Sequence, residues 1–165
     1  MDKSDFSIRF SKEEDFSHLV SWLSEKETMR WFPMSNVQEV EDAAKHWISF
    51  CKKYSCLTAV YRGEPCGSAN LNLNFCQKLQ HQCILSIVVG EAYRNHGVGK
   101  RLLMELQRIA KENFFIELLH LEVYEHNPAI FLYSKLGFIE YGRHPHFIKE
   151  SLGCYRNKIL MQKLL

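Results

Sequence analysis

The hydrophobic positions of this chain switch between two periods, which predicts a domain of mixed strands and helices. Residues 6–10 and 57–61 alternate with a period of two, as strands do. A third alternating run, at 66–75, follows the turn-forming residues Arg62-Gly63-Glu64-Pro65, so we expect a hairpin there. Between the first and second strands the apolar residues recur with helical spacing, which predicts two helices.

Two capping signals predict where these helices begin. Ser11 is followed three residues later by Glu14, and Asn36 by Glu39, which is the spacing of a capping box. We therefore expect Ser11 to cap the first helix, with Glu14 reaching back to it, and Asn36 to cap the second. The segment at 25–33, with mixed charge and two neighbouring aromatic residues, is expected to be a loop between the helices.

A strand, a turn with glycines and a helix follow one another in residues 83–110. The run from Cys83 to Val89 is short, apolar and rich in β-formers, which predicts a strand buried on both faces. A helix is expected from Val98 to about Phe114. Glycines in the turn let the backbone approach a ligand, and the helix start offers free amides and a positive dipole. This is a place to hold a phosphate or pyrophosphate.

The remaining elements complete the order β-α-α-β-β-β-α-β-α-β-β. They are a strand at 118–126, a helix at 129–136 and strands at 138–141 and 155–164. Asn127-Pro128 caps the short helix, Gly137 ends it, and a polar loop is expected at 142–153. A strand-helix-strand succession needs a parallel pair with a right-handed crossover, whereas hairpins are antiparallel. We predict an α/β (α+β) domain whose mixed sheet carries helices on both faces.

Two common phosphate-binding patterns fail at the glycine turn. The dinucleotide fingerprint needs a third glycine where Leu102 stands, and the P-loop needs a glycine at Arg94. The pattern that remains is Arg94-x-x-Gly97-x-Gly99, directly after an apolar strand. It resembles the acetyl-CoA signature, R/Q-x-x-G-x-G/A, of the GNAT superfamily of N-acetyltransferases.

A second block of sequence carries the same resemblance. The run Asn127-Pro128-Ala129-Ile130-x-Leu132-Tyr133-x-x-x-Gly137-Phe138 follows a strand and resembles the second conserved block of the GNAT acetyltransferases, at the spacing the family uses. The element order matches the GNAT fold, with its splayed mixed sheet, over essentially the whole chain. The resemblance implies a single domain at 1–165 that binds acetyl-CoA as cosubstrate and acetylates an amine.

The resemblance assigns the cofactor contacts to two segments. In this family the pantetheine arm inserts between the two parallel strands, so Ile87, Val88 and Val89 would pair with it through their backbone and Asn127 would contact it from the other side. A backbone N–H near Val88 or Val89 would also stabilise the oxyanion. The pyrophosphate would rest on Arg94, Asn95, His96, Gly97, Val98, Gly99 and Lys100. The side chains of Lys100 and Arg101 either attract the phosphates or are ordinary exposed helix charges.

Two residues are candidates for catalysis. Tyr133 lies on the sheet-facing stripe of its helix, and a phenol suits protonation of a departing thiolate, so it is the candidate acid. Glu122 stands on the strand five residues before Asn127, where glutamate occurs in some protein N-terminal acetyltransferases, and is the candidate base. The alternatives are a core tyrosine and a strand glutamate in an ion pair. Glu91 is the second choice for the base.

We infer the amine-binding site from the N-terminal segment. This segment resembles the ribosomal-protein N-terminal and small-amine branch of the superfamily. Trp31 and Phe32 would form a wall of the acceptor pocket, with Glu25 or Glu27 attracting a cation. Alternatively, the two aromatic residues cap the core between the helices. The acceptor is either a peptide N-terminus or a small amine. A non-catalytic acyl-CoA-binding module on the same fold is the alternative function.

Composition narrows the possibilities further. The chain has 165 residues and a net charge of +2, which suits one domain and gives no basic field for nucleic acid. No apolar run has the length of a membrane span, and no signal-type segment opens the chain, so we expect a cytoplasmic monomer or homodimer. The six cysteines include no C-x-x-C pair and are expected to be reduced, with no metal site.

Overall fold

The protein is organised around one seven-stranded mixed sheet. The computed structural model describes residues 5–150 and 153–165. Across the sheet the strands run β1-β2-β3-β4-β5-β7-β6. Their bounds are β1 Phe6–Phe10, β2 Cys56–Tyr61, β3 Glu64–Leu73, β4 Gln82–Val89, β5 Leu118–Tyr124, β6 Ile139–Lys149 and β7 Tyr155–Leu164. β4 and β5 pair in parallel, and the other neighbours are antiparallel, as the crossover and the hairpins predicted.

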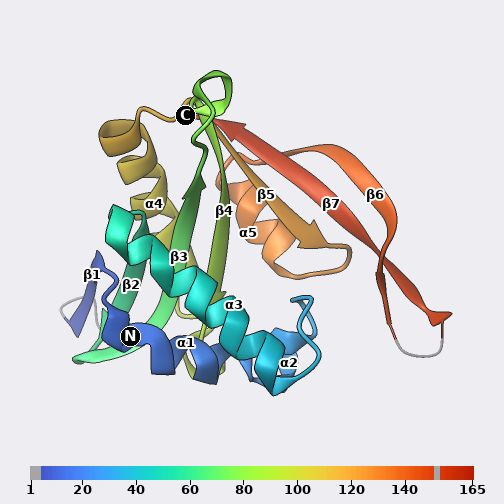
Figure 1. Ribbon diagram of the computed structural model, residues 1–165, viewed down its shortest axis with the longest axis horizontal. Coiled ribbons are helices and arrows are strands. Elements are labelled where there is room, and N and C mark those ends of the chain that lie inside the picture. The colour runs from blue at the N-terminus through green and yellow to red at the C-terminus, as the bar shows by residue number, and fades with distance from the viewer. Residues whose placement is uncertain (1–4, 151–152) are drawn as a thin grey trace.

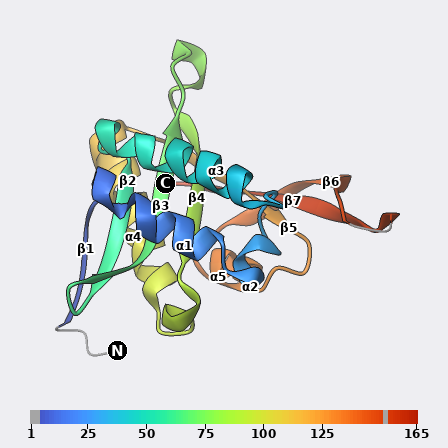
Figure 2. The ribbon, with the colours of Figure 1, turned by 60° about the horizontal axis from the view of Figure 1, so that its bottom comes forward.

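Helices cover both faces of this sheet, which confirms the predicted fold class. They are α1 Phe16–Leu23, α2 Lys26–Met29, α3 Val37–Ser49, α4 Val98–Phe114 and α5 Ala129–Lys135. Figures 1 and 2 show α1, α2 and α3 on one face and α4 and α5 on the other. No helix in the described ranges is long and apolar enough to cross a membrane.

Each face of the sheet packs against its own hydrophobic core. On the side of α4 and α5, Leu102, Leu106 and Tyr133 meet buried residues of every strand from β2 to β5. On the other side a smaller core joins α1 and α3 to the sheet, and there the indole N–H of Trp47 donates to Ser68 Oγ at 3.0 Å. Both helical layers are therefore fixed to the sheet, and both bring side chains to its central strands.

Local signals in the sequence located most elements. β1 and α4 have the predicted bounds. Asn36 Oδ1 accepts the N–H of Glu39 at 2.9 Å and caps α3, as predicted. Gly137, with a φ of 89°, ends α5. The left-handed pair Arg62 and Gly63 forms the predicted turn between β2 and β3.

The predicted cap of the first helix was wrong. Ser11 is buried, and its hydroxyl lies 2.8 Å from Thr58 Oγ1, so it takes part in the core rather than in a helix start. A short 3-10 turn precedes α1, which shifts the capping position by one residue. As a result the carboxylate that reaches back is that of Asp15, which accepts the Lys12 amide at 3.0 Å, and not that of Glu14.

The predicted loops at 142–153 and 25–33 were also wrong in part. β6 continues to Lys149 and forms with β7 a long hairpin that extends beyond the rest of the sheet (Figure 1). Most β6 side chains are exposed, because it is an edge strand, so no apolar alternation marks it. The short helix α2 occupies the middle of the other segment, and four residues are too few to show an apolar stripe.

The parallel pair at the centre of the sheet separates soon after it begins. Pairing of β4 with β5 is confined to three consecutive residues of each strand, Gln82–Ile84 and Leu118–His120. Beyond them both strands continue while they diverge (Figure 1), which leaves the central β4–β5 gap. The prediction of a strand buried on both faces was therefore wrong for β4: Cys83, Leu85 and Val88 are buried, and its other residues are partly exposed.

Candidate active site

The turn between β4 and α4 presents a row of free backbone amides. From Asn95 to Lys100, no backbone N–H donates to the described part of the chain, and the first helical bond runs from Arg101 N–H to Gly97 O at 3.1 Å. Asn95 and Gly97 have φ values of 62° and 82°, and such left-handed steps make successive amides converge on one concavity. The positive end of the α4 dipole lies at the same place. Residues 91–100, here called the phosphate turn, thus have the backbone geometry that suits an anion.

Two glycines give this turn its shape for different reasons. Gly97 has open space where a Cβ would stand, so it is needed for its positive φ alone. At Gly99 a Cβ would lie 3.3 Å from Leu132 Cδ2 and 3.8 Å from Val89 Cγ2. The first turn of α4 therefore packs directly against α5 and the end of β4, which brings both to the phosphate turn.

The side chain of Arg94 points into the protein. Its Nε donates to Val89 O at 3.0 Å, and its Nη2 donates to Glu25 Oε2 at 3.1 Å and to the hydroxyl of Thr28. Glu25 also accepts the N–H of Glu91 at 3.0 Å. Arg94 therefore joins the end of β4 to the segment that follows α1, and Glu25 serves as its partner.

The other polar side chains near the turn have different surroundings. The guanidinium of Arg101 lies over the ring of Phe6, 4.5 Å from its centroid, and so faces β1. Nδ1 of His96 donates to Arg94 O at 2.6 Å, and Lys100 is exposed. Backbone amides are consequently the main anion-binding groups of the phosphate turn.

The edge of β4 that faces β5 carries unpaired backbone groups. Gly90 N–H donates to Cys66 O on β3 at 3.1 Å, and because these groups alternate along a strand, those of Val88 also face β3. The groups of Ile87 and Val89 face the gap instead. The carbonyl of Val89 is occupied by the arginine described above, so within the described chain the N–H and C=O of Ile87 and the N–H of Val89 are unpaired.

Tyr133 projects from α5 into the core against the sheet. Only 8% of it is exposed, and its ring packs edge-on against Phe138 with centroids 6.2 Å apart. Burial raises the pKa of its hydroxyl to about 12. The hydroxyl makes no hydrogen bond to any described residue, although its oxygen is not sealed from solvent. It is a protonated donor without a protein acceptor.

Asn127 fixes the start of α5. Its Oδ1 accepts the N–H of Ala129 at 2.9 Å, and its own backbone N–H donates to Tyr124 O at 3.1 Å. Its Nδ2 has no partner among the described residues and is left to donate to a ligand. This is the group that the expected contact with a pantetheine arm requires.

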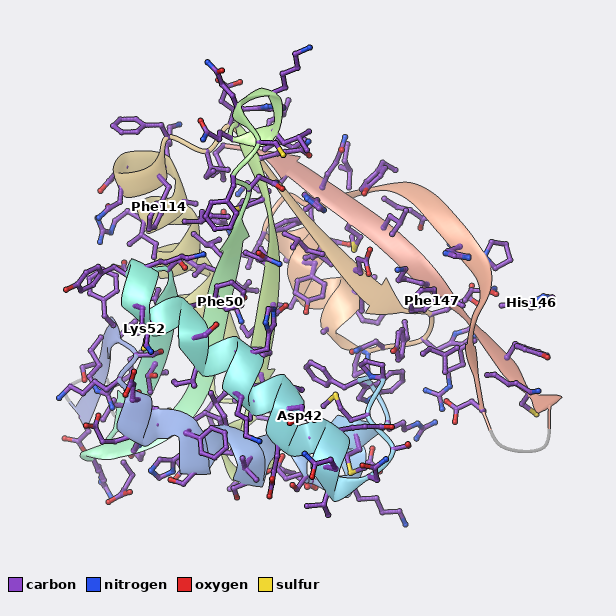
Figure 3. The ribbon with its side chains drawn as sticks, in the orientation of Figure 1. Asp42, Phe50, Lys52, Phe114, His146 and Phe147 are labelled. Atoms are coloured by element: carbon purple, nitrogen blue, oxygen red, sulfur yellow. The ribbon has the colours of Figure 1, made fainter. Side chains whose placement is uncertain are left out.

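Glu122 lies on the face of β5 opposite to α5. Its carboxylate accepts the ammonium of Lys158 on β7 at 2.7 Å, so the ion pair considered as the alternative role is present. The Nζ of Lys158 also lies 3.5 Å from the centroid of the Phe147 ring, which covers it from β6. Figure 3 shows Phe147 on the side of the hairpin nearer β5 and His146 on its outer side.

The two aromatic residues expected in the acceptor wall have different surroundings. Phe32 packs against the smaller core, with its ring centroid 6.5 Å from that of Trp47. Trp31 lies between two guanidinium groups, 5.2 Å from Arg30 and 5.3 Å from Arg156. Phe32 thus caps the core, whereas Trp31 contacts β7 beside the open face of the sheet. Glu27 is exposed on α2.

Residues 17–138 match the family described as the Acetyltransferase (GNAT) family. The chain belongs to this family. Among its relatives, an N-alpha-acetyltransferase from Sulfurisphaera tokodaii is 40% identical over 73 residues, which cover 44% of each chain. A Bacillus subtilis protein assigned as a phosphinothricin acetyltransferase is 40% identical over 81 residues, 48% of this chain and 49% of that one. The matches therefore span about half the length of these curated relatives.

The GNAT fold is matched over nearly the whole chain. The crystal structure of a ribosomal-protein-alanine N-acetyltransferase from Brucella melitensis superposes with a TM-score of 0.82, at 24% identity, and covers 96% of this chain and 99% of that one. At this identity the likeness shows the fold alone. It agrees with the fold expected from the two sequence blocks.

Sequence reasoning missed part of the GNAT site. The contacts of Glu25 and Thr28 with Arg94 join residues more than sixty positions apart, and no local pattern signals them. Lys158 had a signal that was not used: Ile159 and Met161 enter the core, so a lysine directly before Ile159 must lie on the opposite face of the strand. Among the described residues, no three His, Cys, Asp or Glu side chains gather as a metal site.

Proposed function

We propose that this GNAT protein is an acetyl-CoA-dependent N-acetyltransferase that moves an acetyl group to a primary amine by direct attack. One observation carries the proposal: the unpaired edge of β4 and the amide row of the phosphate turn adjoin at the same end of the β4–β5 gap. A ligand that pairs with a strand edge and also carries phosphates fits both features. The family membership of the chain supports the same ligand.

The parts of acetyl-CoA match these features separately. The amide-bearing pantetheine arm would pair with Ile87 and Val89 as an added strand, and Asn127 Nδ2 would contact it from α5. The diphosphate would lie on the amides of 95–100. When bound there, the cosubstrate would supply an activated thioester, and the Val89 N–H would be the donor available to its carbonyl oxygen.

The two candidate catalytic residues lie on opposite sides of the sheet. Leu121 and Val123 enter the core with Tyr133, so Glu122, which alternates with them on β5, faces the other way. An amine arriving from the face of Glu122 would therefore attack with the thiol leaving towards α5. This arrangement supports a single transfer without an enzyme-bound acetyl group.

Tyr133 would protonate the leaving sulfur. As the bond from the carbonyl carbon to sulfur breaks, the electron pair stays on sulfur, and the phenolic O–H donates to it. A pKa of about 12 keeps this hydroxyl protonated throughout the working pH range. Because no described residue accepts its hydrogen bond, the donor remains available for a ligand.

Glu122 would take the proton that the amine loses as the new carbon–nitrogen bond forms. Its carboxylate lies on the face away from α5 and is held by the ammonium of Lys158, 2.7 Å away. About two-fifths of the Glu122 side chain is exposed, which leaves room for an amine or a bridging water. Lys158 itself is nearly buried and holds the carboxylate in place.

The acceptor is a peptide N-terminus or a small amine, and two observations favour the peptide. The relatives of this chain include an N-alpha-acetyltransferase, and the chain shares the fold of a ribosomal-protein-alanine N-acetyltransferase. In addition, Glu122 is partly exposed on the sheet face bordered by α2 and the projecting β6–β7 hairpin (Figure 2), which suits an extended chain. The relative assigned as a phosphinothricin acetyltransferase keeps the small amine as the second candidate.

The test is direct mass-spectrometric detection of acetyl transfer from acetyl-CoA to a panel of amines. The panel holds peptides with varied N-termini, polyamines, aminoglycosides and free amino acids including phosphinothricin. Direct mass detection avoids thiol-reactive dyes, which the six cysteines would disturb. Acetylated peptide N-termini support the first acceptor class, and an acetylated small amine supports the second.

A binding measurement separates catalysis from mere binding. Saturating acetyl-CoA should raise the melting temperature strongly, whereas ATP should not, because ATP has no arm that pairs with a strand edge. Absence of stabilisation by acetyl-CoA overturns the proposal. Stabilisation without transfer to any amine of the panel favours a non-catalytic acyl-CoA-binding module instead.

A further inference from the structure

The segment from Glu25 to Trp31, here called the strap, connects the two ends of the active site. It contains α2 and follows α1 directly. Its first residue bonds to the phosphate turn, and its last residues contact β7. The strap therefore spans from the cofactor side to the acceptor side across the face that an amine would approach (Figure 2).

At its first end the strap is held by the carboxylate of Glu25. The two oxygens accept the N–H of Glu91 at 3.0 and 3.1 Å, and Oε2 also accepts Arg94 Nη2 and the hydroxyl of Thr28 at 2.9 Å. Thr28 is buried and donates and accepts within this cluster. Three elements thus meet on one carboxylate: the phosphate turn, the end of β4 through Arg94, and α2.

At its other end the strap is held by Arg156 of β7. Arg156 Nη1 donates to Arg30 O at 3.1 Å, and the same guanidinium lies over the ring of Trp31. Glu150 pairs with Arg156 Nε at 2.9 Å and fixes its direction. The last two residues of the strap are consequently attached to the hairpin that borders the acceptor face.

We propose that Glu25 is a positioning residue that makes the order of the strap depend on acetyl-CoA, so that the cofactor prepares the acceptor wall before the amine binds. The inference rests on the proposed function. A ligand that pairs with Val89 and lies on the turn's amides fixes both donors that Glu25 accepts, Glu91 N–H and Arg94. Once both donors are fixed, α2 is already ordered. The amine that binds next therefore does not bear the free-energy cost of ordering it.

The coupling is measurable without knowing the acceptor. Hydrogen exchange of peptides covering residues 25–32 is followed with and without saturating acetyl-CoA. In the wild-type chain acetyl-CoA should slow exchange in this segment by at least about fivefold, the lower range of typical coupling factors. In Glu25→Gln the slowing should fall below about twofold, because a neutral amide holds the guanidinium far more weakly than a carboxylate does.

Two further variants keep the test decisive. Thr28→Val keeps the shape of the buried side chain and removes the hydroxyl that joins Arg94 to Glu25, so it should weaken the coupling even where Glu25→Gln fails to fold. Glu112→Gln breaks a surface ion pair at the far end of α4 and should leave the coupling at the wild-type value. Once acceptors are found, Glu25→Gln should raise the acceptor KM at least about fivefold with kcat nearly unchanged.

The outcomes separate this inference from the proposed function. If acetyl-CoA does not bind the wild-type chain, the proposed function fails, and the coupling has no ligand to act through. If acetyl-CoA binds and protects residues 25–32 equally in wild type, Glu25→Gln and Thr28→Val, the positioning role is overturned. A merely structural role predicts that result together with a lower melting temperature. Protection that is lost in both variants, with acetyl-CoA still bound, supports the role.

Discussion

The ammonium nitrogen of Lys158 lies 2.7 Å from a carboxylate oxygen of Glu122, on the open face of the sheet. The lysine is nearly buried under the ring of Phe147, whereas the glutamate is partly exposed. The proposed base thus already holds an ammonium group, the charged form in which most amine substrates arrive. An incoming amine meets a carboxylate that a nearly buried lysine holds in position.

Removing this carboxylate should slow the reaction without unfolding the chain. We expect Glu122→Gln to lower kcat/KM by about 10²-fold, because a positioned general base typically contributes 10²–10⁴-fold. The measurement is steady-state kinetics with the acceptor found by mass spectrometry. Glu117→Gln, an exposed glutamate just before the same strand, is the matched control and should be active. Equal activity of both variants would leave Glu122 as an ion-pair residue only.

Tyr133 should be required for turnover but not for binding. Its hydroxyl has no partner among the described residues, so Tyr133→Phe should fold with almost unchanged stability and bind acetyl-CoA normally. We expect its kcat to fall by about 10²-fold or more, the usual cost of losing a general acid. Calorimetry with CoA and rate measurements check the two parts separately. Wild-type kcat in this variant would remove Tyr133 from the mechanism.

The phosphate turn should lose affinity when Gly97 is replaced. Gly97→Ala forces a side chain into a left-handed conformation with φ of 82°, which costs about 1 kcal/mol and disturbs the amide row. Gly63 offers a matched control: its φ is 85°, it has equal space around it, and it lies in the turn between β2 and β3. Both alanine variants should lose similar stability, and only Gly97→Ala should bind acetyl-CoA more weakly. Equal affinities in the two variants would argue against the turn as the phosphate site.

Asp15 should be a major source of stability at the start of α1. Burial alone would raise its pKa, but hydrogen bonds from Arg9, Lys12 and Thr58 outweigh this and hold the pKa below its usual 3.8. We expect Asp15→Asn to lower the free energy of unfolding by about 2–3 kcal/mol at neutral pH, since Arg9 is partly exposed. Because the pKa is lowered, this stabilisation should be complete above about pH 4 and should decline as the pH falls from there through the lowered pKa. Urea unfolding at pH 7 and pH 3 tests both statements.

High pH should lower the free energy of unfolding, because two buried tyrosines resist ionisation in the folded state. Burial raises the pKa of Tyr133 to about 12, and burial with nearby Glu122 and Glu150 raises that of Tyr124 to about 12. Since both exceed the unfolded value of about 10, their stabilisation is present below pH 10 and is lost as the pH rises towards 12. Above pH 10, Tyr133→Phe should lose stability less steeply than wild type, by about 1.4 kcal/mol per pH unit. Parallel curves for the two proteins would contradict the buried state of Tyr133.

The sequence predicted those parts of the fold that depend on local chemistry. α4 has a long apolar stripe, α3 has an asparagine cap, and α5 has proline and glycine at its ends, so each was located closely. The cap of the first helix was predicted wrongly because Asp15 also bonds to a strand residue, Thr58, far along the chain. β6 escaped prediction because an edge strand is defined by backbone pairing with β7 rather than by its side chains.

The candidate active site also has parts that local sequence predicts and parts that depend on contacts between distant residues. The phosphate turn could be read from Arg94, Gly97 and Gly99, because a glycine pattern encodes backbone shape directly. Which of three neighbouring β4 residues faces the gap depended on the register with β3, and no property of Val88 itself reveals that it faces away. The direction of the Arg94 side chain depended on Glu25, and a contact across such a sequence distance becomes visible only once the chain is folded.

The contact of Gly90 with Trp22 limits how this protein can diverge. A Cβ at Gly90 would stand 2.8 Å from two atoms of the indole, so any substitution there must displace this side chain, which is part of the smaller core next to the segment that begins at Glu25. The proposed acetyl-CoA site therefore tolerates little variation at the contact between Gly90 and Trp22. Residues beyond it, on the exposed side of α2, are free of that steric constraint. Single substitutions there can change which amine is accepted while the proposed acetyl-CoA site stays unchanged.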